Sequence, residues 1–288
     1  MKLQLIIFAF FLLGTAGNCI DQKQVIPDGE IIQEPRDREI FEEMMQKFSG
    51  KKGVPMGELI IAIGKSLEGT PYVGGTLEKG DDEKLVVNLR EMDCTTFVEN
   101  CLALARTIKS GEPDYDSFLQ ELQQIRYRNG LRNLYPSRLH YFSEWLLNNA
   151  EKNVISLPAK GFGEIYPNRV DFMSKHPGSY PCLKAKPEFV AEMEKLESII
   201  SANEYYFVPK EKIAAIENLL QEGDFAGITT GIEGLDIVHS VLLTRVSGRI
   251  HILHASSSAK KVVVSDEPLA DYILKSKTQT GIMVGRPL

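Results

Sequence analysis

The chain has 288 residues, of which 43% are hydrophobic and 25% are charged. This composition is that of a globular protein, and it excludes collagen, a coiled coil and a largely disordered chain. The 33 Lys and Arg residues against 39 Asp and Glu residues give a formal net charge of -6 without a basic block, so nucleic acid is not an expected partner. Four cysteines are too few for a disulfide-built scaffold, so a hydrophobic core must stabilise the fold.

The first residues have the layout of a secretory signal. Met1 and Lys2 form a short positive start, and residues 3–13 are apolar. An apolar run of about eleven residues is too short for a membrane-spanning helix, which needs roughly 20. We predict a signal peptide over residues 1–18, with Gly14 and Ala16 at the positions that require small side chains, and export to the periplasm or cell envelope.

Two other readings of this segment stay open. Cys19 could be the lipidated first residue of a bacterial lipoprotein, which would be the protein's only attachment to a membrane. The apolar run could also form a buried N-terminal helix. Residues 19–38 are polar and predict a tether, followed by a single domain over residues 39–288.

Helical spacing of apolar residues dominates the first half of that domain. It starts near Asp37 and continues to Phe48, and it returns over residues 56–67 before Gly69 and Pro71. Residues 84–89 predict a strand. The clearest helix runs from Asp93 to about residue 110, and further helices are expected within 116–150, at 188–203 and at 209–222. Residues 151–187 are rich in Pro, Gly and Lys and predict irregular structure.

The end of the sequence changes character. The runs 238–246, 249–255 and 261–265 are rich in Val, Ile and Leu and predict short strands, the first two joined by the turn Ser247-Gly248. Helices followed by an antiparallel sheet indicate an α+β fold.

Cys94 is the first candidate for chemistry. If Asp93 caps the helix, Cys94 is its first residue, where unpaired backbone N–H groups and the positive end of the helix dipole favour a thiolate and can stabilise an oxyanion. Cys101 lies two turns further, about 10 Å away along the helix, so the two cannot form a disulfide. The alternative is that Cys94 is a small buried residue that only packs.

A cysteine nucleophile needs a base, usually a histidine. His239 begins one predicted strand and His254 ends the next, so the turn between them would bring both to the same end of a hairpin. His239 could then accept the thiol proton while His254 orients its ring. His251 is three residues from His254 and faces the other side of the strand. Each histidine alone could equally be an ordinary packed or exposed residue.

Two other histidines, His140 and His176, lie outside these strands. Arg138, His140, Tyr141 and Trp145 crowd polar and aromatic groups before a helix, as in a carbohydrate or peptide pocket or a packed helix start. His176 has the surroundings of a surface loop residue. No paired-cysteine or HExxH motif occurs, so we expect no metal and no cofactor.

Four ordered motifs resemble the NlpC-type papain-like cell-wall peptidases and amidases: Pro71-Tyr72-Val73-Gly74-Gly75, Asp93-Cys94-Thr95-Thr96-Phe97-Val98, His239-Ser240-Val241-Leu242 and Leu253-His254-Ala255. Further segments are similar to the AmiA-like N-acetylmuramoyl-L-alanine amidase branch: Ser137-Arg138-Leu139-His140-Tyr141, Asp171-Phe172-Met173-Ser174, Gly234-Leu235-Asp236-Ile237-Val238-His239 and His254-Ala255-Ser256-Ser257. The similarity spans about residues 40–288.

The resemblance implies a papain-like core with a large helical insertion at about 112–222. It implies Cys94 as nucleophile, His239 as base and His254 as the orienting residue. The implied substrate-binding residues are Tyr72, Gly75, Arg138, His140, Tyr141 and Asp236.

The expected function is hydrolysis of peptidoglycan fragments (muropeptides) at the amide between the muramic lactyl group and L-Ala, through a cysteine thioester. Two alternatives remain: an endopeptidase that cuts between γ-D-Glu and diaminopimelate in the stem peptide, and a non-catalytic peptidoglycan-binding protein.

Overall fold

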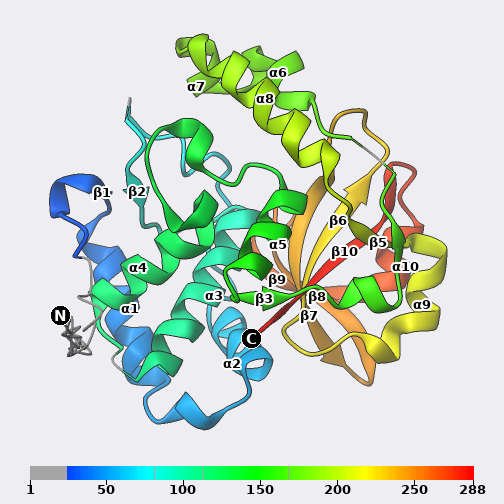
Figure 1. Cartoon of the computed structure of the whole chain (residues 1–288). Helices are drawn as coiled ribbons and strands as arrows, with labels where there is room; N and C mark the ends of the chain where they lie inside the picture. Colours follow the sequence, from blue (N-terminus) through cyan, green and yellow to red (C-terminus); the bar gives the residue numbers. More distant parts are fainter. Residues whose placement is uncertain (1–24, 81, 112, 168) are drawn as a thin grey trace, which may run out of the picture.

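The computed structural model describes residues 25–80, 82–111, 113–167 and 169–288. The predicted signal peptide and the alternative lipid site at Cys19 lie outside these residues. Over the described ranges, no helix combines the length and the apolar character that crossing a membrane requires. The fold is mixed α/β: a long antiparallel sheet with helices packed against it (Figure 1).

The helices and strands have the following bounds. The helices are α1 (Pro35–Lys47), α2 (Met56–Ser66), α3 (Cys94–Ser110), α4 (Tyr115–Arg126), α5 (Phe142–Glu151), α6 (Phe172–Lys175), α7 (Pro181–Ala185), α8 (Glu188–Ala202), α9 (Ile213–Ile216) and α10 (Leu269–Leu274). The strands are β1 (Ile31–Ile32), β2 (Leu85–Val86), β3 (Ile155–Ser156), β4 (Glu164–Ile165), β5 (Tyr206–Pro209), β6 (Phe225–Thr230), β7 (Ile237–Val246), β8 (Arg249–Ser256), β9 (Lys261–Pro268) and β10 (Gln279–Pro287).

The large sheet has the order β4-β5-β10-β6-β7-β8-β9, and β3 pairs with one end of β10. The three strands predicted near the end of the sequence are confirmed as β7, β8 and β9, which form an antiparallel meander. The sequence analysis missed β6 and β10. Both are almost wholly buried and lack the apolar–polar alternation that marks a half-exposed strand.

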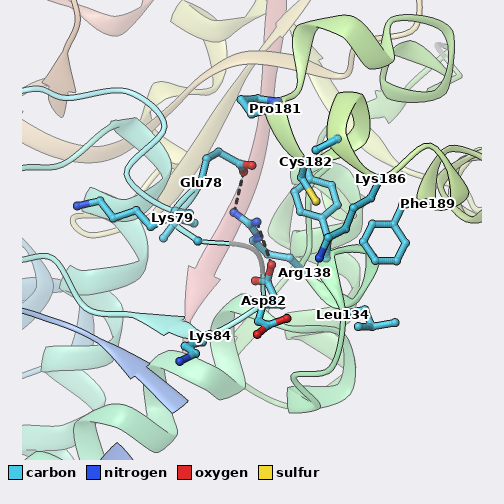
Figure 2. A pocket seen from close by; sticks show the side chains of 15 residues that line it. Glu78, Lys79, Asp82, Lys84, Leu134, Arg138, Pro181, Cys182, Lys186 and Phe189 are labelled. Carbon is cyan, nitrogen blue, oxygen red and sulfur yellow. Dashed lines mark hydrogen bonds and ion pairs between the residues drawn. The ribbon is translucent and has the colours of Figure 1, made fainter. Parts of the chain in front are cut away.

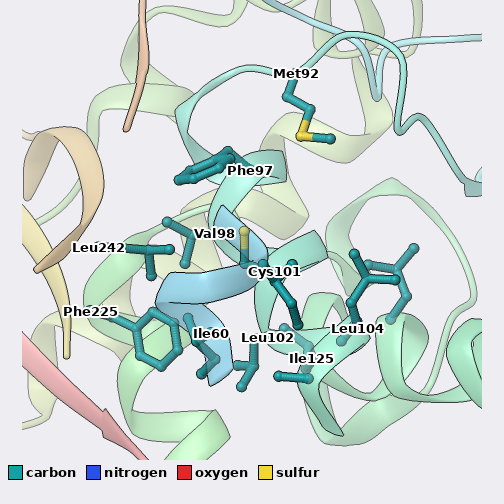
Figure 3. Packing of buried hydrophobic residues seen from close by; sticks show 14 of the residues in the cluster. Ile60, Met92, Phe97, Val98, Cys101, Leu102, Leu104, Ile125, Phe225 and Leu242 are labelled. Carbon is teal, nitrogen blue, oxygen red and sulfur yellow. The ribbon is translucent and has the colours of Figure 1, made fainter. Parts of the chain in front are cut away.

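Apolar side chains on both faces of the sheet form the core. Leu242 and Leu253 face α2 and α3, whereas Val241 and Leu243 face the opposite core, next to α10. Figure 3 shows how Cys101 packs among the apolar residues of the α3 side. Burial raises the pKa of its thiol well above the ordinary value, so Cys101 behaves as a small apolar residue.

Helix α3 crosses the interior of the helical layer, and its polar side chains are therefore paired. The carboxylate of Glu99 accepts a 2.7 Å hydrogen bond from Arg126 Nε of α4, and both side chains are only 2% exposed. Arg126 Nη1 also donates to the carbonyl of Val86 in β2. One buried ion pair thus fastens α3, α4 and the small sheet to one another.

The tether prediction is wrong for the described part of residues 19–38. Strand β1 pairs in parallel with β2, and α1 starts at Pro35. Asp37 is fully buried: its carboxylate accepts from the N–H groups of Glu34 and Leu89 and from Arg90 Nε. Composition counts a buried carboxylate such as that of Asp37 as polar in the same way as a solvated one, so it could not reveal this structural role. Of the strand predicted at 84–89, only β2 forms.

The expected helical insertion at 112–222 contains strands as well as helices. The helices expected within 116–150 form as α4 and α5, which are separated by irregular chain, and α8 matches the prediction at 188–203. Within the stretch expected to be irregular, β3 pairs with β10 and β4 pairs with β5. Because β5 also pairs with β10, this region extends the main sheet.

The helix predicted at 209–222 is reduced to α9, with a 3-10 turn on each side. In this segment, hydrogen bonds to distant residues replace those of a regular helix. Arg245 Nη2 donates to the carbonyls of Glu217 and Leu220, and the Glu217 carboxylate accepts from Arg249. Helical periodicity in the sequence did not reveal these competing contacts.

Replacing Asp37 with alanine is expected to lower the free energy of unfolding by about 3 kcal/mol, because it leaves a partly buried arginine and two backbone N–H groups without their acceptor. Urea unfolding followed by circular dichroism measures the change. Glu39→Ala, at a 60% exposed side chain of the same helix, is the control and should change stability little. Equal effects of the two substitutions would contradict the structural role of Asp37.

Candidate active site

Cys94 is the first residue of α3, as predicted, because the residues around it form a closed cap. Asp93 Oδ1 accepts a 2.8 Å hydrogen bond from the N–H of Thr96, and Thr96 Oγ1 accepts from the N–H of Asp93 at 2.9 Å. Gly111 ends the helix in the left-handed conformation, with φ of 93°. The cap fixes where the helix starts and so which residue stands at its N-terminus.

The β7–β8 hairpin brings the two predicted histidines together. Ser247 and Gly248 both have positive φ, as a two-residue hairpin turn requires. His239 Nε2 lies 2.6 Å from His254 Nδ1, with the two rings nearly perpendicular. His251 points elsewhere, and its Nδ1 lies 2.8 Å from the carbonyl oxygen of Ser265.

Cys94 and His239 line one cavity of about 250 Å³. Most of the residues that line this cavity are aromatic or apolar. They include three of the six predicted substrate-binding residues, His140, Tyr141 and Asp236, and also Glu78, Thr95, Tyr135, Leu139, Phe142, Trp145, Met173, Tyr180, Leu235, Ile237 and Val238. A thiol and an imidazole therefore share a largely desolvated space large enough for part of a small ligand.

The expectation that the helix N-terminus holds Cys94 as a thiolate is not supported. Burial raises the pKa of the Cys94 thiol, and the neighbouring Asp93 carboxylate raises it further. Contacts with Ser240 and Thr95 offset only part of this increase. In this cavity the cost of desolvating a thiolate exceeds the stabilisation expected from the helix end. The raised pKa favours the neutral thiol, so a nucleophilic role for Cys94 would require a base.

The two histidines are neutral as well. Burial lowers the pKa of His239 to about 3, with a further contribution from His254, and burial lowers the pKa of His254 to about 4. A neutral imidazole has one donor and one acceptor nitrogen. Because Nε2 of His239 is engaged by His254, Nδ1 is its remaining nitrogen for a proton from the cavity.

The polar atoms of the predicted pocket residues are largely engaged within the protein. Asp236 Oδ2 accepts from the N–H of Ser143 at the start of α5, and burial raises the pKa of Asp236. The Tyr141 hydroxyl donates to Glu197 Oε1 at 2.6 Å. His140 Nε2 lies 2.9 Å from the carbonyl oxygen of Tyr135, and burial lowers the pKa of His140 to about 3. These residues shape the cavity wall more than they offer free polar groups.

Tyr72 and Gly75 lie off that wall. Tyr72 is held beside Met92 by a parallel bridge, and its N–H donates to the carbonyl of Lys260. Burial raises the pKa of the Tyr72 phenol, with smaller contributions from the nearby Cys94 and Asp93, so the ring is close to the nucleophile candidate. Gly75 is an exposed turn residue with φ of 71°. Because Gly75 has no side chain and a positive φ, it contributes to this region only through its backbone conformation.

Arg138 does not reach the Cys94 cavity. Its guanidinium is 7% exposed and forms 3.1 Å ion pairs with Glu78 and Glu83 in an adjoining cavity (Figure 2). Glu78 lines both cavities. The sequence analysis missed Glu78 because it lies in a polar turn with no motif, and only the tertiary structure places it at the site.

Three further observations complete the description of these residues. His176 is exposed, as predicted, and its ring stacks on Phe172. Cys94, Cys101 and Cys182 are free thiols. Among the residues that the structure describes, no group of three or more His, Cys, Asp or Glu side chains is arranged to hold a metal ion.

Comparison with known proteins gives consistent results for the family. Two crystal structures of an N-acetylmuramoyl-L-alanine amidase from Bacteroides uniformis are each 36% identical to the chain, cover 81% of it and 98% or 99% of their own chains, and have TM-scores of 0.77 and 0.78. A protein from Bacteroides fragilis with a provisional xylanase name is 38% identical, covers 78% of this chain and 99% of its own, and has a TM-score of 0.75. No curated protein matches the chain.

A family model described as AmiA-like, N-acetylmuramoyl-L-alanine amidase-like, matches residues 62–282. These residues include α3, both histidine strands and the whole region between them. The chain belongs to the AmiA-like, N-acetylmuramoyl-L-alanine amidase-like family.

Proposed function

We propose that the protein is a cysteine amidase that cleaves the amide between the lactyl group of muramic acid and L-Ala in peptidoglycan fragments. The observation that carries the proposal is the 2.6 Å contact between His239 and His254 at the edge of the cavity that His239 shares with Cys94. Family membership supports the amide and the substrate class. The order of nucleophile helix and histidine strands is that of the papain-like NlpC-type hydrolases.

The reaction starts from two neutral groups. His239 Nδ1 takes the proton as Cys94 Sγ attacks the lactyl carbonyl, so the ion pair forms only as the new C–S bond does. The backbone N–H of Cys94, with the Tyr72 hydroxyl, stabilises the oxyanion. The His239 imidazolium then protonates the departing L-Ala amine, which leaves an acyl thioester on Cys94.

Hydrolysis of the thioester reverses these roles. His239 removes a proton from water, the hydroxide attacks the thioester carbonyl, and the thiolate leaves and recovers the proton. The products are a muramic carboxylate and a peptide with a free L-Ala amine. His254 positions the His239 ring throughout, because a 2.6 Å hydrogen bond to Nε2 restricts its rotation.

The mechanism uses no cofactor. We further propose that residues 1–18 direct the protein out of the cytoplasm and that Cys19 is its only possible lipid attachment point. The alternative endopeptidase would use the same residues on the bond between γ-D-Glu and diaminopimelate. A peptidoglycan-binding protein would need neither a free Cys94 nor the histidine pair.

Replacing Cys94 with alanine is expected to abolish cleavage of a disaccharide-tetrapeptide, lowering kcat by at least about 10³-fold, because the acyl acceptor is removed. Mass spectrometry of the products should show free disaccharide and an L-Ala-led tetrapeptide with the unmodified enzyme. Cys182→Ala is the matched control for losing a free thiol. Release of a dipeptide that begins with diaminopimelate, with L-Ala-γ-D-Glu left on the disaccharide, would identify an endopeptidase, and no cleavage at all would favour the binding protein.

The pH dependence of kcat/KM should lack an acid limb near 6.5. Lowering the pH protonates His239 only as it approaches a pKa of about 3, so the neutral base persists through mildly acidic solution. At the alkaline side, the raised pKa of Cys94 keeps its thiol protonated beyond the range of an ordinary cysteine. We expect a flat profile from about pH 5 to pH 8. A half-maximal point near 6.5 would show that the base is solvated and contradict this description.

His254→Ala is expected to reduce kcat by roughly 10²-fold with little change in KM, because the His239 ring loses its orienting partner. The same substitution should raise the pKa of His239, since His254 contributes to lowering it, and so move the acid limb to higher pH. His254→Gln keeps a side-chain amide near Nε2 and should recover part of kcat. An unchanged pH profile in His254→Ala would show that His254 only packs against its neighbours and does not affect His239.

A further inference from the structure

A second cavity, of about 200 Å³, adjoins the cavity that contains Cys94. Its wall combines the loop that follows Gly75, the segment around Tyr135 and Arg138, and the chain at α7 and the start of α8 (Figure 2). Glu78 and Tyr135 belong to both walls. The two cavities are therefore neighbours, and a substrate that extends from Cys94 past Glu78 would reach the second cavity.

The two cavities differ in charge. The Cys94 cavity is lined mostly by aromatic and apolar side chains, with Glu78 and Asp236 as its carboxylates. Seven charged residues of both signs line the second: Glu78, Lys79, Asp82, Glu83, Lys84, Arg138 and Lys186. This difference is large for adjoining spaces of similar size, and it predicts ligand groups of different character in each.

Arg138 organises the second cavity. It is nearly buried and its charge is matched by Glu78 and Glu83, so it holds two carboxylates in place more than it offers a charge to a ligand. Lysines remain on two sides: Lys84 comes from the loop, and Lys186 lies beyond α7, its ammonium 5.8 Å from the centre of the Phe189 ring. Residues of both charges thus line one space.

The charged lining of the second cavity indicates which part of a muropeptide would bind there. The saccharide of a muropeptide is uncharged once its lactyl group is in the amide, whereas the stem peptide carries carboxylates and, at its third residue, an ammonium group as well. Burying charge is favourable only where opposite charges are close. On the basis of the proposed function, we infer that the second cavity binds the charged third residue of the stem peptide, with Lys84 and Lys186 at its carboxylate and Glu78 and Asp82 at its ammonium.

The first test uses the unmodified enzyme and three substrates: N-acetylmuramoyl dipeptide, the tripeptide with diaminopimelate, and the tripeptide with the side-chain amine acetylated. We expect kcat/KM for the diaminopimelate tripeptide to exceed that for the dipeptide by about 25-fold, since two partly exposed charge contacts contribute about fivefold each. Acetylation of the side-chain amine should lower that preference about fivefold. Equal rates on all three would overturn the inference while leaving the amidase reaction intact.

The second test measures the tripeptide-to-dipeptide ratio of kcat/KM in variants. Lys186→Gln and Lys84→Gln should each lower this ratio, with a combined loss of about fivefold. Lys65→Gln, an exposed lysine of α2 outside both cavity walls, removes the same charge and should keep the ratio. A ratio unchanged in the double variant would overturn the assignment of these lysines. Absence of cleavage of every substrate would instead contradict the proposed function.

Discussion

The desolvation of the thiol and the two imidazoles is the constraint on which the site depends. The same packing that brings Cys94, His239 and His254 together also removes water from them, so burial raises the pKa of the thiol and lowers those of the rings. These shifts favour the uncharged form of all three groups. In the proposed mechanism, charge separation would be confined to the reaction itself, when the attacking sulfur and the protonated ring are close enough to stabilise each other.

The surrounding fold makes this arrangement rigid. The cap at Asp93 and Thr96 fixes the first turn of α3, and the buried pair of Glu99 and Arg126 fixes the helix against α4. On the other side, the hairpin turn at residues 247–248 fixes the two histidines relative to each other. Cys94 and His239 come from different layers, so their separation is set by how α3 packs on β7, through side chains such as Phe97 and Leu242.

Local sequence patterns were sufficient for the elements that carry the candidate chemistry. Asp93 before Cys94 and Gly111 after the helix define α3, and Ser247-Gly248 between two apolar runs defines the histidine hairpin. These signals lie within one element or one turn, where spacing and capping chemistry determine structure. The chain between residues 112 and 222 was harder, because its strands form only by pairing with distant partners such as β10.

The sequence also could not predict how burial shifts the pKa values of the site residues or which charged groups pair there. The position of Cys94 at a helix start is visible in the sequence, but how deeply it is buried depends on side chains from α5, α6 and β7. The residues that close the cavity, such as Met173 and Tyr180, lie in a stretch that looked irregular. Similarly, the resemblance singled out Arg138 as a substrate-binding residue, whereas its carboxylate partners Glu78 and Glu83 could be identified only in three dimensions.

The place of β10 in the sheet has a consequence for the order of folding. It is the last strand in the sequence, yet it lies between β5 and β6 and also pairs with β3, so it joins segments separated by more than one hundred residues. During synthesis the strands before it have no central partner until residues 279–287 emerge from the ribosome. Such a topology disfavours early folding of the nascent chain, because its long-range contacts form last. A chain that stays unfolded until its synthesis is complete would keep the extended form that the export proposed above requires.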